Sequence, residues 1–360
     1  MKVLKFGGTS VGSAQRMKEV AKLITDGERK IVVLSAMSGT TNTLVEISDY
    51  LYKKNPEGAN EIINKLESKY RQHIDELFAT PEYKQKGLEL IKSHFDYIRS
   101  YTKDLFTLFE EKVVLAQGEL ISTAMMNYYL QECGVKSVLL PALEYMRTDK
   151  NAEPDPVYIK DKLQVQLELH PDAEIYITQG YICRNAYGEI DNLQRGGSDY
   201  TASLIGAAIN ASEIQIWTDI DGMHNNDPRI VDKTAPVRHL HFEEAAELAY
   251  FGAKILHPTC IQPAKYANIP VRLLNTMDPT APGTLISNDT EKGKIKAVAA
   301  KDNITAIKIK SSRMLLAHGF LRKVFEIFES YQTSIDMICT SEVGVSVSID
   351  NVKHLNEILD

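Results

Sequence analysis

The sequence predicts an α/β protein: a three-layer αβα sandwich around a mostly parallel sheet, with a helical insertion and a smaller second unit. Three observations predict this fold class. Short apolar runs alternate with amphipathic helical patterns in residues 1–41 and again from about 137, as in a parallel sheet covered on both faces. Residues 42–132, rich in Lys, Glu, Leu and Tyr, repeat their apolar residues at helical spacing. Beyond residue 296 the order is β-α-β-β-α, typical of a ferredoxin-like unit that lacks its last strand.

The first forty residues predict a β-α-β unit. Val3–Phe6 and Ile31–Leu34 are apolar runs of strand length, and Ala14–Ile24 between them has one apolar face. Each run is followed by a loop of small residues, Gly7–Gly12 and Ser35–Thr41. Ligands bind at the carboxyl ends of strands in open α/β sheets, so the second of these loops is expected at a binding site.

The same patterns predict the remaining elements. Strands are expected at 137–140, 174–178 and 214–218, and helices at 120–133, 199–210 and 242–251. In the C-terminal unit, strands are expected at 304–309, 334–339 and 343–349, and helices at 320–331 and from 352. Gln117-Gly118-Glu119 is expected to open the helix at 120–133, which places a carboxylate in its first turn, where it compensates the helix dipole.

Composition excludes several classes of function. The 360 residues, 44% hydrophobic and 25% charged, suffice for two domains, which we expect at 1–290 and 297–360. A net charge of −7 gives no basic excess for a nucleic-acid partner. No apolar run approaches the roughly 18 residues of a membrane span. The cysteines (Cys133, Cys183, Cys260 and Cys339) lie far apart. We therefore expect free thiols, a cytoplasmic location, and neither a membrane nor a nucleic-acid partner.

The segment Lys5-Phe6-Gly7-Gly8-Thr9-Ser10-Val11 is the first candidate for chemistry. A lysine ends the apolar run and two glycines follow, so a cation lies beside backbone N–H groups that no side chain covers. Such a strand-to-helix turn favours phosphate. Gly7 and Gly12 have P-loop spacing, but Ser13-Ala14 stands where that motif has Lys-Ser or Lys-Thr. The alternative, that the glycines serve packing alone, stays open at this point.

The segment Arg195-Gly196-Gly197-Ser198-Asp199 is the second candidate. It precedes a predicted helix, whose N-terminus favours an anionic group together with Arg195, because arginine can hold a carboxylate through two parallel hydrogen bonds. The alternative is a capped helix start, since Ser and Asp are preferred N-cap residues. Asp199 would repel an anion unless it offsets a cation such as Lys5 or Mg²⁺. We therefore expect it to organise a transfer site.

Two further segments add weaker signals. Thr218-Asp219 ends a predicted strand and begins a turn suited to hydrogen-bonding a base or ribose. A calcium loop is excluded there, because Pro228 stands where an EF-hand has its final Glu. Lys254 lies near another glycine at a helix end, and His257 before a proline is interpreted as structural. Two lysines, an arginine and glycine-rich turns suit phosphoryl transfer, which needs positioning and charge neutralisation more than covalent catalysis.

Four ordered motifs resemble those of the aspartate kinases, members of the amino-acid kinase superfamily. They are Lys5–Val11, Arg195–Ala202, Thr218-Asp219 and Phe251–Pro258, and the match runs along essentially the whole chain. The helical insertion and the C-terminal unit look most like the monofunctional, lysine-sensitive type. The resemblance implies the amino-acid kinase fold. It also implies ATP-dependent phosphorylation of the side-chain carboxylate of L-aspartate to 4-phospho-L-aspartate, the first step of lysine, threonine and methionine biosynthesis.

The resemblance also implies roles for single residues. Lys5 would neutralise the transferring phosphoryl group and Asp199 would organise the site. Aspartate would be held by Ser35, Thr41, Glu119, Arg195 and Ser198, with Glu119 on its ammonium group and Arg195 on a carboxylate. ATP would be bound by Lys5, Gly7, Gly8, Thr218, Asp219, His224, Arg229 and Lys254, where His224 replaces a tyrosine common in the family. Mg²⁺ would be held largely by the phosphates, so no metal site on the protein is expected.

The C-terminal unit resembles the start of an ACT domain, the regulatory module of this family. The expected effector is lysine, bound by Met314, His318, Gly319, Phe320, Leu321, Asp336, Thr340, Ser341 and Glu342. A second ACT domain and a returning strand are expected in the full-length protein, which would form a homodimer through its ACT domains. Two alternatives stay open: another amino-acid or carbamate kinase of the superfamily, and a catalytically silent amino-acid sensor.

Overall fold

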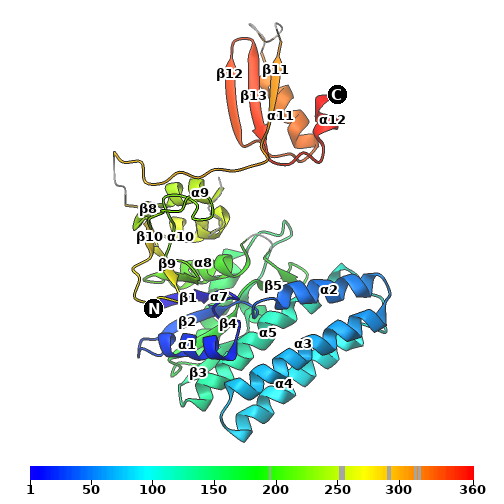
Figure 1. The fold of residues 1–360 in the computed structure, drawn as a ribbon, viewed down its shortest axis with the longest axis vertical. Coiled ribbons are helices and arrows are strands. Elements are labelled where there is room, and N and C mark those ends of the chain that lie inside the picture. Colours follow the sequence, from blue (N-terminus) through cyan, green and yellow to red (C-terminus); the bar gives the residue numbers. More distant parts are fainter. Residues whose placement is uncertain (194–195, 251–255, 290–292, 312–313, 315–317) are drawn as a thin grey trace. The chain divides into compact units, whose positions relative to one another are not determined.

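The chain forms two compact units, 1–299 and 300–360, which are described separately. The structure, a computed structural model, describes residues 1–193, 196–250, 256–289, 293–311, 314 and 318–360 (Figure 1). Among these residues, no helix combines the length and the apolar character needed to cross a membrane.

A mixed sheet lies at the centre of the first unit. Within the described residues it has eight strands in the order β3-β4-β2-β1-β7-β9-β10-β8. The strands are β1 (Lys2–Phe6), β2 (Lys30–Leu34), β3 (Ser137–Leu140), β4 (Ile175–Gln179), β7 (Ile214–Thr218), β8 (His239–His241), β9 (Val271–Asn275) and β10 (Thr284–Ser287). All neighbours pair in parallel except β9 and β10. The expected mostly parallel sheet is confirmed.

Helices cover both faces of this sheet. Successive strand residues point to opposite sides, so apolar strands such as β1 present hydrophobic side chains to both faces. Leu4 and Phe6 of β1 belong to one core, which is shared with α1 (Ala14–Ile24) and the helical insertion. Val3 belongs to a second core on the opposite face. That core is covered by α6 (Ala142–Tyr145), α7 (Pro156–Glu168), α8 (Gly197–Ile209), α9 (Phe242–Tyr250), the short helix η1 (Pro258–Ile261) and α10 (Gln262–Tyr266). A hairpin of β5 (Ile182–Arg184) and β6 (Ile190–Asn192) connects β4 to α8.

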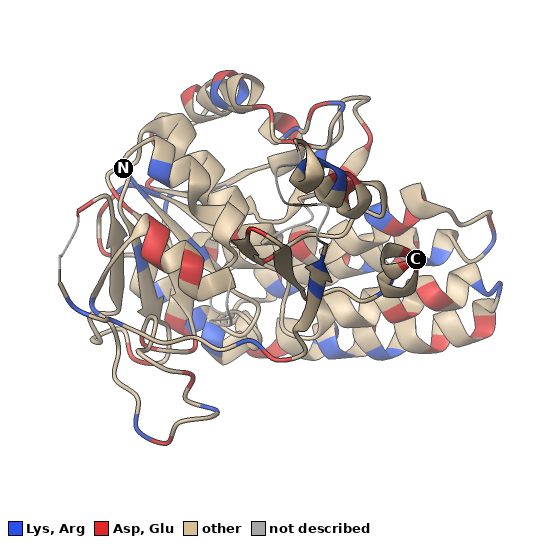
Figure 2. Cartoon of the chain, turned by 90° about the horizontal axis from the view of Figure 1, so that it is seen from above, with Lys and Arg blue, Asp and Glu red and all other residues tan. Residues whose placement is uncertain are grey.

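The insertion is helical, as the sequence predicts. It consists of α2 (Thr40–Tyr52), α3 (Pro56–Leu77), α4 (Pro81–Ser100) and α5 (Leu108–Glu132), and α3 and α4 run side by side (Figure 1). Both α3 and α4 have a proline in their first turn, where its missing N–H costs nothing. Basic and acidic residues are interspersed along the long helices (Figure 2), partly as ion pairs one turn apart such as Glu61 with Lys65.

One expectation about the insertion is wrong: Glu119 is not in the first turn of a helix. Helix α5 begins at Leu108, where Thr107 and Glu110 form a capping box, and Glu119 lies buried in its middle. Gly118 therefore marks a close approach and not a helix start. A Cβ on Gly118 would lie 2.8 Å from the Cβ of Ala36, so the missing side chain lets α5 pack against the loop after β2.

The second unit packs one helix against a small antiparallel sheet in the order β11-β13-β12. Its elements are β11 (Thr305–Lys310), α11 (Phe320–Ser330), β12 (Met337–Ser341), β13 (Gly344–Ile349) and α12 (Leu355–Leu359). Strand β12 begins three residues later than its pattern predicts, because the turn after α11 extends to Thr333, whose N–H bonds to the carbonyl of Phe328. The predicted β-α-β-β-α order is present.

Candidate active site

The carboxyl ends of four neighbouring strands meet at one edge of the sheet. Phe6 of β1 is paired with both Leu34 of β2 and Trp217 of β7, and Leu34 is paired in turn with Gln179 of β4. The loops that follow these strands therefore begin side by side. They start at Gly7, Ser35, Gly180 and Asp219.

An ion pair between Lys5 and Asp199 lies at this edge. Lys5 Nζ is 2.7 Å from Asp199 Oδ1, and the two side chains are only 11% and 15% exposed. Lys5 comes from β1 and Asp199 from the first turn of α8. A Cβ on Gly7 would lie 3.5 Å from Lys5 Nζ, so the glycine leaves the ammonium group approachable. The carboxylate holds the lysine in place where a ligand carrying negative charge can reach it.

The start of α8 is built from glycines and not from a side-chain cap. Its N-cap is Gly196, with φ of 76°, and no side chain caps the helix. The Ser198 side chain does not cap the helix. Its Oγ accepts a hydrogen bond of 2.8 Å from Ser35 Oγ, in the loop after β2. A Cβ on Gly180 would lie 2.3 Å from Ser198 Oγ, so a side chain at 180 would occupy the serine's place. The capped-start alternative is thus excluded for Ser198 and Asp199.

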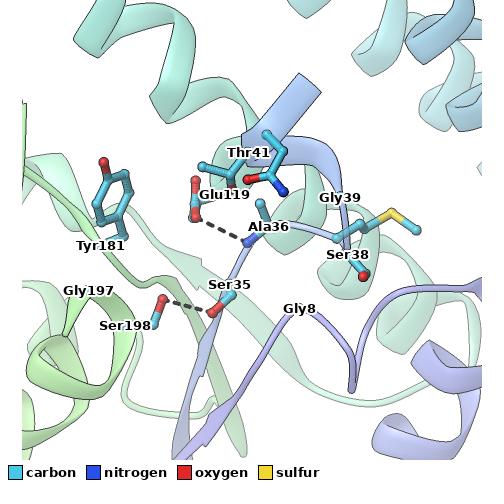
Figure 3. Close-up of a pocket in the computed structure, with 12 residues that line it drawn as sticks. Gly8, Ser35, Ala36, Ser38, Gly39, Thr41, Glu119, Tyr181, Gly197 and Ser198 are labelled. Carbon is cyan, nitrogen blue, oxygen red and sulfur yellow. Dashed lines mark hydrogen bonds between the residues drawn. The ribbon is translucent and has the colours of Figure 1, made fainter. Parts of the chain in front are cut away.

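A pocket of about 380 Å³ is lined by Ser198, the residue before Asp199, and by residues of the loops after β1 and β2 (Figure 3). It brings together five residues that the sequence predicts for the site: Gly8, Ser35, Thr41, Glu119 and Ser198. The rest of its lining comes from Ala36, Met37, Ser38, Gly39, Asn42, Tyr181 and Gly197.

Glu119 gives the pocket a buried negative charge. Its residue is 3% exposed, and Oε1 accepts a hydrogen bond of 3.2 Å from the backbone N–H of Ala36. Oε2 is buried and has no hydrogen-bond partner among the described residues. Burial raises the pKa of Glu119 to about 7, against a smaller lowering by the Ala36 N–H. A ligand cation at Oε2 would satisfy this oxygen and stabilise the carboxylate form.

Tyr181 is a pocket residue that the sequence reasoning missed. It follows Gly180 at the end of β4 and has a positive φ of 69°, rare for a bulky residue. Its N–H donates to Thr201 Oγ1 at 3.0 Å and its carbonyl accepts from the N–H of Leu193 at 2.7 Å. Tyr181 could have been found from the predicted strand at 174–178, because residues just past a parallel strand lie at the ligand-binding edge of the sheet.

Four of the residues expected to bind nucleotide lie at the end of β7 and in the segment after it: Thr218, Asp219, His224 and Arg229. The Thr218 hydroxyl bonds locally to the backbone of Ile220, and Asp219 is exposed. His224 Nδ1 lies 2.7 Å from Thr234 Oγ1. Arg229 is paired with Asp227 at 2.5 Å and its side chain is 64% exposed. Among the described members of this set, Gly8 lines the pocket, Lys5 forms the ion pair and Gly7 lies beside Lys5. Arg195 and Lys254 fall outside the described residues.

The residues expected to bind the effector occupy the second unit. Gly319 is the N-cap of α11 with φ of 81°, and Phe320 begins that helix. Met314 and Ser341 lie at one end of the small sheet, where the N–H of Ser311 bonds to Val343. Asp336 precedes the opposite end of β12 and bonds to Ser348 there. The remaining members are Leu321 on α11, Thr340 on β12, and His318 and Glu342 on exposed turns. One copy thus distributes these residues over both ends of β12.

Comparison with known proteins matches residues 1–275 to the model of the amino acid kinase family. Aspartokinase 1 of Arabidopsis thaliana, a chloroplastic protein, is 38% identical over 98% of this chain and 63% of its own length. Lysine-sensitive aspartokinase 3 of Escherichia coli is 35% identical over 97% of this chain and 78% of its own. The chain spans 63% to 66% of the length of the Arabidopsis relatives, aspartokinases 1 to 3.

Solved structures agree with the sequence match. A crystal structure of E. coli aspartokinase III in complex with aspartate and ADP superposes with a TM-score of 0.84 at 34% identity, over 98% of this chain and 79% of that one. The same enzyme in complex with lysine and aspartate gives a TM-score of 0.79 over 97% of this chain and 79% of that one. The predicted amino-acid kinase fold is confirmed, and the chain belongs to the amino acid kinase family, within its aspartokinase group.

Proposed function

We propose that this chain is an aspartate kinase, which transfers the γ-phosphoryl group of ATP to the side-chain carboxylate of L-aspartate. One observation carries the proposal: the pocket lined by Ser198, the residue before Asp199 of the ion pair, holds a buried carboxylate, Glu119, with one oxygen unpartnered among the described residues. An amino-acid substrate brings the ammonium group that this oxygen lacks. Likeness to E. coli aspartokinase III in complex with aspartate and ADP supports the same assignment.

The substrate is held by groups on three elements. The ammonium group of aspartate binds Glu119, and the hydroxyls of Ser35, Thr41 and Ser198 hydrogen-bond its carboxylates. Arg195, two residues before the start of α8, is proposed to bind a carboxylate as a bidentate partner. These groups orient the reacting carboxylate toward Lys5, which converts an encounter of two anions into a positioned attack.

Charge neutralisation is the main catalytic task. The attacking carboxylate oxygen forms a bond to the γ-phosphorus while the bond to the β–γ bridging oxygen breaks, and the products are an acyl phosphate and ADP. Negative charge is spread over the phosphoryl oxygens in the transition state. Lys5 stabilises that charge from a fixed position, because Asp199 and the burial of both side chains restrict its movement.

The nucleotide is proposed to bind along the loops after β1 and β7, through Gly7, Gly8, Thr218, Asp219, His224, Arg229 and Lys254. The backbone N–H groups before α1 favour its phosphates. Mg²⁺ bound together with ATP would supply further charge neutralisation. In the described part of the chain no group of three or more His, Cys, Asp or Glu is placed to hold a metal ion.

The second unit is proposed to be the start of an ACT domain that senses lysine. E. coli aspartokinase III has been crystallised with lysine, and its lysine-sensitive sequence aligns with this chain through the second unit. Every residue of β12 is exposed, and an exposed strand edge is a template for pairing with a second chain. We therefore propose that lysine inhibits the enzyme and that homodimers form through this edge. The cytoplasmic location stays a prediction.

The decisive experiment measures acyl phosphate formed from ATP, Mg²⁺ and L-aspartate, trapped with hydroxylamine, with and without lysine. We expect turnover with aspartate, suppressed by lysine. Turnover with another amino acid or carbamate in a substrate panel, but not with aspartate, would replace the substrate assignment. Lysine binding without any turnover would favour the silent sensor, against which the intact Lys5–Asp199 pair argues.

A further inference from the structure

We propose that Tyr70, in the helical insertion, is a positioning residue for the substrate pocket and acts through its hydrogen bond to Thr40. The inference rests on the proposed kinase activity and deepens it, because it assigns a task to an insertion that lines no part of the pocket beyond the start of α2 and Glu119 of α5.

The contact is buried and specific. The Tyr70 hydroxyl on α3 lies 2.8 Å from Thr40 Oγ1, and both residues are 1% exposed. The Tyr70 ring packs against Phe95 of α4, with ring centroids 5.8 Å apart. Because α3 and α4 hold the ring from one side, the hydroxyl is presented to Thr40 from a fixed place.

Thr40 in turn anchors the loop that forms one wall of the pocket. It is the first residue of α2, and its N–H bonds to the carbonyl of Met37 at 3.0 Å. The residues around it, Met37, Ser38, Gly39 and Thr41, line the pocket. Ser38 and Gly39 are exposed, so the loop depends on its buried ends for a defined position.

Helix α5 holds Thr40 from the other side. A Cβ on Gly118 would lie 3.2 Å from Thr40 Cγ2 and 2.8 Å from the Ala36 Cβ. Ala36 donates its N–H to Glu119. The position of Thr40 between α3 and α5 therefore fixes two binding groups together: the Thr41 hydroxyl and the N–H that orients Glu119.

Removing the Tyr70 hydroxyl should thus change the position of the loop that lines the pocket. In Tyr70→Phe the ring stays, but the Thr40 hydroxyl is left buried without its partner. An unpaired buried hydroxyl is costly, and the exposed loop beside it is the part that can move to relieve it. The shift displaces Thr41 and Ala36 but neither Lys5 nor Asp199, so substrate binding should suffer more than turnover.

The chain offers a matched control. Tyr145 and Thr178 form a second buried tyrosine–threonine hydrogen bond of 2.6 Å, with both residues 0% exposed. Thr178 lies within β4, which pairs with β2 and β3 on its two sides. Loss of that hydroxyl lowers stability without freeing a loop of the pocket.

The test compares steady-state kinetics and hydrogen exchange of Tyr70→Phe and Tyr145→Phe. For Tyr70→Phe we expect KM for aspartate to rise by about tenfold, the scale of one buried hydrogen bond. Both kcat and KM for ATP should stay within about twofold, and amide exchange in residues 36–42 should accelerate. Tyr145→Phe should lower Tm with unchanged KM for aspartate. Thr40→Val should raise KM for aspartate as Tyr70→Phe does, whereas Thr40→Ser, which keeps a hydroxyl, should leave KM close to that of the unmodified enzyme. The double variant Thr40→Val/Tyr70→Phe should raise KM by less than the product of the two single effects.

An unchanged KM for aspartate in Tyr70→Phe, or an equal rise in Tyr145→Phe, would overturn the proposal. The exchange measurement needs no substrate, so it separates this inference from the proposed function. Faster exchange at 36–42 confined to Tyr70→Phe supports the positioning role even if another substrate replaces aspartate. Unaltered exchange there refutes the role even if the enzyme phosphorylates aspartate.

Discussion

The two halves of the candidate active site differ in how far they are assembled. On the substrate side, residues from α2, α5, α8 and the loop after β2 converge on one pocket, and Ser35, Ser198 and Glu119 are already in contact with partners across it. On the nucleotide side, the predicted side chains at the end of β7 and after it bond to near neighbours in the chain. Arg229 pairs with Asp227 and His224 lies against Thr234.

The difference follows from burial. Contacts on the substrate side connect elements of the core, so folding itself fixes them. The segment after β7 is more exposed. Asp221 and Met223 connect it to Gly283 and Thr284, but the side-chain contacts of His224 and Arg229 join residues only two to ten positions apart. We infer that aspartate meets a preformed site, whereas ATP reorganises its own.

The largest expected effect is at the ion pair between the two halves. Lys5→Ala should lower kcat by roughly two or more orders of magnitude, because it removes charge stabilisation in the transition state. The matched control is Lys30→Ala. Lys30 is a buried lysine at the start of β2, far from the carboxyl end of the strands, and it pairs with Asp26. Lys30→Ala should lower Tm and leave kcat within a few-fold. Hydroxylamine trapping measures kcat of both variants. Near-normal turnover of Lys5→Ala would show that Lys5 does not stabilise the transition state.

The second-largest effect tests whether the substrate side binds aspartate through the carboxylate form of Glu119. Binding of the ammonium group needs the carboxylate form, and the pKa of Glu119 is raised to about 7 by burial. KM for aspartate should therefore rise as pH falls below about 7, approaching tenfold per unit well below it. Glu119→Gln should raise KM by about thirtyfold or more, the scale of losing one partner of a buried charge pair. It should also abolish the pH dependence in this range.

A persisting pH profile in Glu119→Gln would assign the titration to another group. KM for ATP in the same variant serves as the internal control, because the Glu119 side chain bonds to Ala36, which is not among the residues proposed to bind the nucleotide. An equal rise in both constants would indicate a general disturbance of the fold and would contradict a preformed substrate half.

A smaller effect is expected where α5 touches the pocket loop. Gly118→Ala places a Cβ 2.8 Å from the Ala36 Cβ, so the loop after β2 must shift. We expect KM for aspartate to rise about fivefold, since overpacking costs about 1 kcal/mol or more. Gly87→Ala in α4 is the control, because its Cβ would meet the end of the Ile74 side chain at 2.6 Å, within the helical insertion. Equal kinetic defects in both variants would remove the special role of Gly118.

The sequence predicts the parallel part of the sheet well, because its buried strands are continuous apolar runs. It also predicts the loop that begins at Ser35 at the ligand-binding edge, since residues past parallel strands share that edge. Lys5 and Ser198 were assigned to the site from their glycine-rich motifs and the family resemblance. Glu119 was assigned to the site but to the wrong part of a helix: Gly118 signals close packing against Ala36, and only tertiary structure distinguishes this from a helix start. Tyr181 was missed because its positive φ is imposed by contacts with Thr201 and Leu193, which are distant in sequence.

The smallest expected effect concerns Arg229 on the nucleotide side. Its pair with Asp227 is exposed, and such pairs contribute about 1 kcal/mol or less, so the arginine can leave it for a phosphate at little cost. Arg229→Ala should therefore raise KM for ATP about threefold and leave KM for aspartate unchanged. Arg322, which pairs with Glu326 on the exposed side of α11, provides a control arginine outside the first unit. If Arg229→Ala and Arg322→Ala leave KM for ATP equally unchanged, Arg229 stays with Asp227 in the working enzyme, and the nucleotide half is organised by Lys254 and the loop after β1 instead.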